Sequence, residues 1–128
     1  MSYDTSILLD PCDHCGRHAD VISLGNMTSN VGAMYRAAMP GPYPGGGRYD
    51  GTGDPEPCGG LRGLSGLRCS DALPILRAGL AAMAEREAEM RALEPSNGWG
   101  SYEGAVAYLT EIADVCEANP RGTLAVNW

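Results

Sequence analysis

The stretch Ser101-Tyr-Glu-Gly-Ala-Val-Ala-Tyr-Leu-Thr-Glu-Ile-Ala-Asp-Val-Cys-Glu-Ala118 carries the clearest structural signal in the chain. Its apolar side chains recur every three or four residues, the spacing that gathers them on one face of a helix. Ser101 is a residue type that caps helix starts, and Asn119-Pro120 breaks the pattern. We therefore predict an amphipathic helix. Its predicted buried face consists of Tyr102, Ala105, Val106, Leu109, Ile112, Ala113 and Cys116.

Strands are predicted at both ends of the chain. Residues 3–9 alternate with period two, and residues 19–24 form a second short strand. Turn-forming residues fill 10–16 between them, which favours a β-hairpin. Residues 123–126 are predicted as a final strand. The predicted inward face of the first strand consists of Tyr3, Thr5, Ile7 and Leu9.

Further helices are predicted between the hairpin and residue 95. One covers 31–38, after a run of N-cap residue types, and ends at Pro40. Another begins at Ser70 and Asp71 as a capped start, and its charged continuation over 84–92 includes a favourable i,i+4 pair between Glu87 and Arg91. Its predicted core-facing residues are Leu73, Leu76, Leu80 and Met83, with Met90 as an extension.

This order of elements predicts an α+β fold. A small antiparallel sheet, formed by the N-terminal hairpin plus the C-terminal strand, is expected to pack against three to four helices. A length of 128 residues fits a single domain, 1–128. Glycine and proline crowd residues 40–60, which we interpret as an insertion that is either mobile or a functional loop.

Charge and hydropathy exclude some classes of function. The net charge of −7 argues against a protein that binds nucleic acid by neutralising phosphates. Apolar runs are too short for a transmembrane helix, and the first residues lack the basic and apolar regions of a signal peptide. We expect a protein of the cytoplasm, without nucleic-acid or membrane partners.

The cysteines suggest a structural zinc site. Cys12 and Cys15 have the two-residue spacing of a zinc knuckle, His18 follows closely, and Cys58 begins a second glycine turn that could be tied back to the hairpin. These four residues are the predicted ligands, with Cys69 or His14 as substitutes. Reduced free thiols remain the alternative, because the second half of the set is not a Cys-x-x-Cys pair. Cys116 lies on the apolar face and is predicted to be a buried core thiol.

The segment Asn26-Met-Thr-Ser-Asn30 is rich in short polar side chains just before a helix. Asn26, Thr28 and Asn30 could therefore bind an anion or a carbonyl group with the free amides of the helix start. The alternative is a helix cap with local turn bonds.

The segment Asn97-Gly-Trp-Gly-Ser-Tyr-Glu103 places two glycines around a tryptophan directly before the last helix. Trp99 and Tyr102 could stack on a planar ligand, with Asn97 reading its edge and Glu103 accepting hydrogen bonds. In the alternative, Trp99 plugs the end of the core while Asn97 and Ser101 cap the helix.

Five segments of the sequence resemble a family of small phage and prophage proteins. They are the start Met-Ser-Tyr-Asp, the stretch Gly25-Asn-Met-Thr-Ser-Asn-Val31, the pair Gly63-Leu-Ser-Gly66 and Ala72-Leu-Pro-Ile-Leu-Arg77, and Glu94-Pro-Ser-Asn-Gly-Trp-Gly-Ser-Tyr-Glu-Gly-Ala105. The resemblance spans most of the chain outside residues 40–60. It implies a phage protein in the cytoplasm of a bacterial host, and it brings no established activity.

We therefore expect a non-enzymatic accessory protein that binds a small polar or nucleotide-like ligand, or a host protein, between the two polar segments. The alternative function is a zinc-stapled structural or interaction module, in the virion or as a host-factor adaptor. A hydrolase or transferase is least favoured, because the two histidines stand beside the cysteines and the sequence singles out no nucleophile with its base.

Overall fold

The computed structural model describes residues 2–11, 14–15 and 18–128. In these residues the chain forms a three-stranded sheet and a set of helices. None of the helices in this part of the chain has the length and apolar content needed to cross a bilayer. In chain order the elements are β1 (Ser2–Pro11), β2 (His18–Thr28), the 3-10 helix η1 (Ser29–Val31), α1 (Gly32–Ala38), α2 (Gly60–Leu64), α3 (Cys69–Glu85), α4 (Glu87–Ala92), α5 (Tyr102–Ala118) and β3 (Thr123–Asn127).

The sheet is antiparallel, with strand order β2-β1-β3. Ile7 of β1 lies opposite Ile22 of β2 on one side and Leu124 of β3 on the other. The predicted inward face of β1 is confirmed, because Tyr3, Thr5 and Ile7 are buried while Leu9 packs against the core from its margin. Both observed strands of the hairpin, Ser2–Pro11 and His18–Thr28, are longer than the predicted ranges 3–9 and 19–24.

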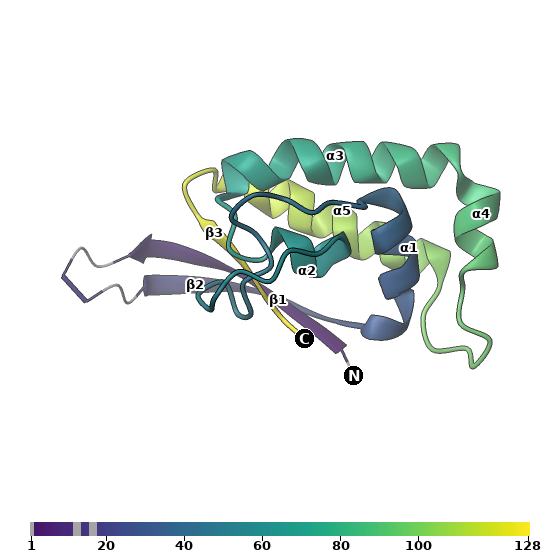
Figure 1. The fold of residues 1–128 in the computed structure, drawn as a ribbon, viewed down its shortest axis with the longest axis horizontal. Coiled ribbons are helices and arrows are strands. Elements are labelled where there is room, and N and C mark those ends of the chain that lie inside the picture. The colour runs from purple at the N-terminus through teal and green to yellow at the C-terminus, as the bar shows by residue number, and fades with distance from the viewer. Residues whose placement is uncertain (1, 12–13, 16–17) are drawn as a thin grey trace.

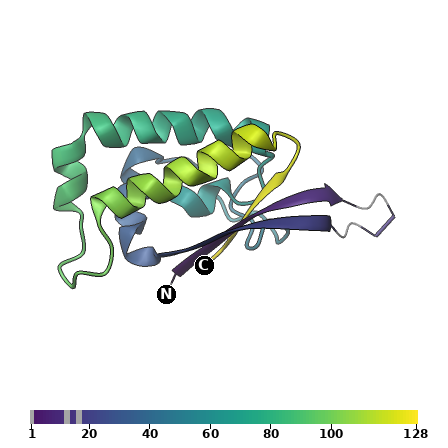
Figure 2. The same ribbon diagram turned by 180° about the vertical axis from the view of Figure 1, so that it is seen from behind.

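The helices cover the sheet in layers, which confirms the α+β prediction. Helix α5 crosses one face of the sheet, α3 runs alongside α5, and α1 and α2 lie on the side of α5 that faces the viewer in Figure 1. Figure 2 shows α5 from the opposite side, where it is in front. The Tyr108 hydroxyl connects α5 to the sheet, because it donates to the Gly25 carbonyl at 3.1 Å and shares a hydrogen bond with the Thr5 hydroxyl at 2.8 Å.

The predicted face of α5 is nearly the observed one. Six of the seven predicted residues are buried, Val106 is half-buried, and Tyr108 joins them. The Ser101 cap is confirmed, since its Oγ accepts from the Gly104 amide at 3.0 Å. Cys116 is fully buried, as predicted. Its hydrogen bond to Cys69 and its burial both raise the pKa of the Cys116 thiol.

Helix α3 differs from the prediction at its start and in its buried face. It begins at Cys69, and Arg68 stands at the N-cap without a side-chain bond, so the predicted Ser70/Asp71 cap is wrong. The amides of Cys69 and Ser70 instead donate to the backbone carbonyls of Gly122 and Pro120, at 2.8 and 3.0 Å, so no side-chain cap is needed there.

The predicted burial of Leu76, Met83 and Met90 is confirmed, whereas Leu73 and Leu80 pack against the core from its margin. Gly79 takes a buried position in their place, so close to Met39 that a Cβ would come 2.7 Å from Met39 Cγ. The buried residues of α3 are Cys69, Ala72, Leu76, Gly79 and Met83.

The glycine- and proline-rich segment 40–60 packs closely on the rest of the fold. The Arg48 amide donates to the Ser65 carbonyl at 2.9 Å, and the Asp50 amide donates to the Val126 carbonyl at 2.9 Å. Tyr49 also forms a parallel bridge with Val126. The segment thereby covers part of the outer edge of β3, whose backbone groups would otherwise be unpaired.

Candidate functional site

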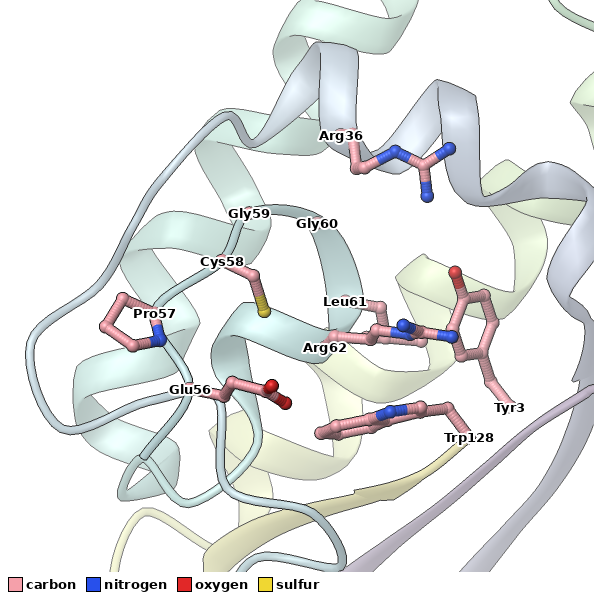
Figure 3. A pocket seen from close by; sticks show the side chains of 10 residues that line it. All are labelled: Tyr3, Arg36, Glu56, Pro57, Cys58, Gly59, Gly60, Leu61, Arg62 and Trp128. Atoms are coloured by element: carbon pink, nitrogen blue, oxygen red, sulfur yellow. The ribbon is translucent and has the colours of Figure 1, made fainter. Parts of the chain in front are cut away.

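A cavity of about 330 Å3 opens beside the start of α2. Residues from four separate parts of the chain surround it: β1, α1, the segment that leads into α2, and the end of β3 (Figure 3). Its volume lies at the lower end of the range for small-molecule sites, about 300–1,000 Å3. We call it the arginine cavity. Its lining residues are Tyr3, Arg36, Glu56, Pro57, Cys58, Gly59, Gly60, Leu61, Arg62 and Trp128.

Two glycines allow the segment before α2 to approach α1. A Cβ on Gly59 would come 2.3 Å from the Pro40 carbonyl oxygen, a distance at which no side chain fits. Gly60 has φ +70°, a backbone conformation that side chains disfavour, and its amide donates to the Met39 carbonyl at 2.7 Å. This close approach sets Cys58 and Arg62 on the same cavity as Arg36 of α1.

Arg62 is held against an aromatic ring. Its guanidinium lies 5.1 Å from the centroid of the Trp128 ring, a cation–π distance. Tyr49 packs edge-on against the same ring, with centroids 5.1 Å apart. The Arg62 Nε is buried and has no hydrogen-bond partner among the described residues. A buried donor without an acceptor is costly, so this position favours a ligand that supplies one.

Arg36 faces the cavity from α1, beside the hydroxyl of Tyr3 (Figure 3). Both side chains lie over Gly32, where a Cβ would come 2.5 Å from the Tyr3 hydroxyl oxygen and 2.8 Å from Arg36 Nη1. Burial raises the pKa of Tyr3, and the positive charges of Arg62 and Arg36 partly offset that rise. The phenol therefore stays protonated at neutral pH and offers the cavity another polar group.

Cys58 lies between charges of opposite sign. Burial raises the pKa of its thiol, the positive charge of Arg62 lowers it, and the negative charge of Glu56 raises it. The net effect is a pKa above the ordinary value, so the neutral thiol predominates at neutral pH. An activated nucleophile would need the reverse shift.

Alkylation of Cys58 by iodoacetamide is therefore expected to begin at higher pH in the folded protein than in the chain unfolded by urea. The thiolate is the reactive form, and a raised pKa lowers its fraction at any given pH. Arg62→Ala should move the midpoint of the rate profile further up, because a favourable charge is lost, and Glu56→Gln should move it down. Mass spectrometry of the Cys58 peptide measures both rates. If the parent, Arg62→Ala and Glu56→Gln proteins all showed the same midpoint pH of alkylation, the assigned effects of these two charges on Cys58 would be wrong.

The structure brings the two predicted polar segments together through a glycine. A Cβ on Gly100 would meet Val31 Cγ1 at 2.8 Å and Thr28 Cγ2 at 3.0 Å. Thr28 caps η1, since its side chain accepts from the Asn30 amide at 3.4 Å. Asn26 and Asn30 are exposed. The cap alternative is thus observed at Thr28, and ligand binding by Asn26, Thr28 and Asn30 stays a prediction.

The residues of the second polar segment have different environments. Trp99 is 70% exposed, so the alternative in which it plugs the core is wrong; the flanking glycines turn it outward. Tyr102 is buried, its hydroxyl donates to the Met83 carbonyl at 3.1 Å, and Arg91 covers its ring. An exposed stacking surface at Tyr102 is therefore also wrong, because the helix turns this ring into the core.

Asn97 and Glu103 are engaged locally. The Asn97 side chain accepts from the Trp99 amide at 2.9 Å, as in a turn. Glu103 Oε1 lies 2.7 Å from Arg91 Nη2, and the hydrogen bond from Arg91 lowers the pKa of this carboxyl. Arg91 also forms the predicted pair with Glu87, at 3.1 Å.

Cys15 and Cys58, the two predicted zinc ligands whose side chains the structure describes, lie in separate places. Cys12 is outside the described residues, as is the side chain of His18, and Cys15 is exposed at the hairpin turn. Cys58 lines the cavity with Tyr3, near the other end of β1, and the strand rises about 26 Å from Tyr3 to Pro11 at about 3.3 Å per residue. Cys69, the proposed substitute, is buried beside Cys116.

In the described part of the chain, no group of three or more His, Cys, Asp or Glu side chains is close enough to hold a metal ion. A zinc site at the hairpin turn stays a prediction, and the structure does not bring Cys58 to it.

Sequence reasoning missed the arginine cavity. It selected the turn at Cys58, Gly59 and Gly60, which lines the cavity, but it assigned metal chemistry there. Nothing in the spacing of Arg36, Arg62 and Trp128 signals that they meet, because they are far apart in the chain. An available signal was the pair of glycines before Arg62, which indicates a close backbone approach.

Comparison of the chain with models of protein families, with curated protein sequences and with solved structures finds no match. The resemblance to phage proteins therefore stays a prediction, and the proposals below rest on the geometry of the cavity.

Proposed function

We propose that this protein is a non-enzymatic binding protein whose ligand is a small polar anion held in the arginine cavity. The observation that carries the proposal is Arg62, whose buried Nε finds no acceptor among the described residues. Arg36 lines the same cavity, so two arginines border one cavity in a chain whose net charge is −7. Guanidinium groups bind carboxylates and phosphates through paired, charge-assisted hydrogen bonds.

A compact anion fits this cavity better than a nucleotide does. The Trp128 ring already contacts Arg62 and Tyr49, so it serves to position Arg62 and is not left free to stack on a base. The expectation of a small polar ligand is retained, in a different place from the polar segments that suggested it.

The protonation state of the thiol in the cavity argues for ligand binding without a catalysed reaction. Cys58 lines it, and its raised pKa leaves it as a neutral thiol. With the resemblance to phage proteins as context, we propose that the ligand is met in the cytoplasm of a bacterial host.

Fluorescence titration tests the proposed function. Trp99→Phe removes the exposed tryptophan and leaves Trp128, in the cavity wall, as the remaining one of the two. Succinate and inorganic phosphate, added separately, should give a saturable change in Trp128 emission with at least one of them. Arg62→Ala should weaken that binding roughly tenfold or more, the loss expected for a charged hydrogen bond of about 1.5–3 kcal/mol.

Arg121→Ala is the matched control. Arg121 is exposed and precedes β3, whereas Trp128 follows it, so the variant removes the same charge at the other end of the strand. It should bind as the parent does. If neither anion gives a saturable change, or if the two arginine variants bind alike, the proposed function is wrong.

A further inference from the structure

The arginine cavity holds a negative charge as well as positive ones. Glu56 lines it on the side away from Arg36 and Tyr3, with the Cys58 thiol above it (Figure 3). Both Glu56 and Arg62 act electrostatically on that thiol, in opposite directions, so both face the same small volume.

These opposite charges are not paired with each other. Among the described residues, the ion pairs within 4.0 Å join Arg77, Arg86 and Arg91 to carboxylates on the helices, and none includes Arg36, Arg62 or Glu56. The Glu56 side chain is exposed, and this residue is held by its backbone amide, which donates to the Gly47 carbonyl at 3.1 Å. The cavity therefore has a cationic side, formed by Arg36 and Arg62, and an anionic side, formed by Glu56. The charged groups on both sides can form an ion pair with a ligand.

We propose that the ligand is zwitterionic, of the amino-acid class, with its carboxylate on Arg36 and Arg62 and its ammonium group on Glu56. This proposal rests on the proposed function and narrows it. A ligand with anionic groups alone would place negative charge near Glu56, whereas an ammonium group placed there gains a charge-assisted hydrogen bond. The cavity volume of about 330 Å3 suits a compact molecule of this kind.

Succinate and aspartate are the matched probes, because aspartate is succinate with one added ammonium group. In the Trp99→Phe background, D- and L-aspartate are titrated beside succinate while Trp128 emission is followed. We expect the better aspartate enantiomer to bind about fivefold more tightly than succinate, the effect of one partly solvated charge pair. Glu56→Gln should remove this preference and leave the binding of succinate equal or stronger.

Glu85→Gln is the control for lost charge, since Glu85 is exposed at the end of α3. It should keep the preference for aspartate. Equal binding of succinate and both aspartates, or a preference that survives Glu56→Gln, would overturn the zwitterion and leave the anion-binding function standing. Failure of all three probes would remove both proposals. A thermal melt of each variant shows whether the cavity is still folded when a loss is recorded.

Discussion

Ser65→Ala is expected to lower the free energy of unfolding by about 2–3 kcal/mol, although it removes one oxygen atom. Ser65 is fully buried, and its hydroxyl connects three segments of the chain. Its Oγ accepts from the Val126 amide at 2.9 Å and from the Gly51 amide at 3.1 Å, and it donates to the Arg48 carbonyl. Alanine would leave the buried Val126 amide without its acceptor, and such a donor costs about 1–3 kcal/mol.

Ser65→Ala should also loosen the wall of the arginine cavity at Trp128. The outer edge of β3 pairs with residues 48–50 and 66–68, and the Ser65 hydroxyl lies where these segments meet. Trp128, two residues beyond Val126, contacts Tyr49 of the same segment. Urea unfolding followed by circular dichroism measures the loss of stability. Trp128 emission in the Trp99→Phe background should show the loosened end of β3.

Ser70→Ala provides the comparison for this prediction. Ser70 is exposed on the first turn of α3, and its side chain makes no hydrogen bond within the described part of the chain, so its replacement should change stability by less than about 0.5 kcal/mol. Equal midpoints for Ser65→Ala and Ser70→Ala would mean that the Ser65 hydroxyl does not hold the edge of β3.

Local patterns in the sequence were sufficient for the elements with strong periodicity. The apolar spacing of residues 102–116 predicted the buried face of α5, and the alternation from Tyr3 to Ile7 predicted the inner face of β1. Both signals come from neighbours in the chain, because the period of a helix or strand decides which side chains share a face. The fold class followed from the order of these elements.

The position of α3 and the cavity depended on distant contacts that no local pattern contains. In α3, Leu76 and Met83 are buried as predicted, but the close approach of Met39 puts Gly79, and not Leu80, in the buried face. In the cavity, Arg62 obtains its position from Trp128, which is at the far end of the chain. Such pairings are decided by packing between elements, and a sequence alone gives only the residue types.

The same limit explains the interpretation of residues 40–60. The glycine and proline content of this segment predicts an insertion that is either mobile or a functional loop. In the structure, several of these glycines instead occupy positions where one backbone lies directly on another. Composition could not separate these cases, because glycine serves both flexible linkers and close packing.

Gly46→Ala tests whether residues 40–60 form a flexible linker or a closely packed segment. We expect it to lower the free energy of unfolding by more than about 2 kcal/mol. A Cβ at Gly46 would come 1.9 Å from the Gly63 carbonyl oxygen and 3.2 Å from the Tyr43 carbonyl oxygen. Both are backbone atoms, so no side-chain rotation relieves the overlap, and α2 or the segment itself would have to move. Such overpacking typically costs about 1–3 kcal/mol, and rigid neighbours raise the cost.

Gly53→Ala is the matched variant in the same segment, because its Cβ would meet nothing nearer than the Tyr49 carbonyl oxygen at 3.5 Å, an ordinary contact. It should leave the urea midpoint almost unchanged, or raise it slightly as the unfolded chain loses freedom. A segment that moved freely would accept both substitutions alike. A large loss for Gly46→Ala beside none for Gly53→Ala would show that residues 40–60 belong to the packed fold, and that the wall of the arginine cavity at Glu56 and Cys58 is fixed before any ligand arrives.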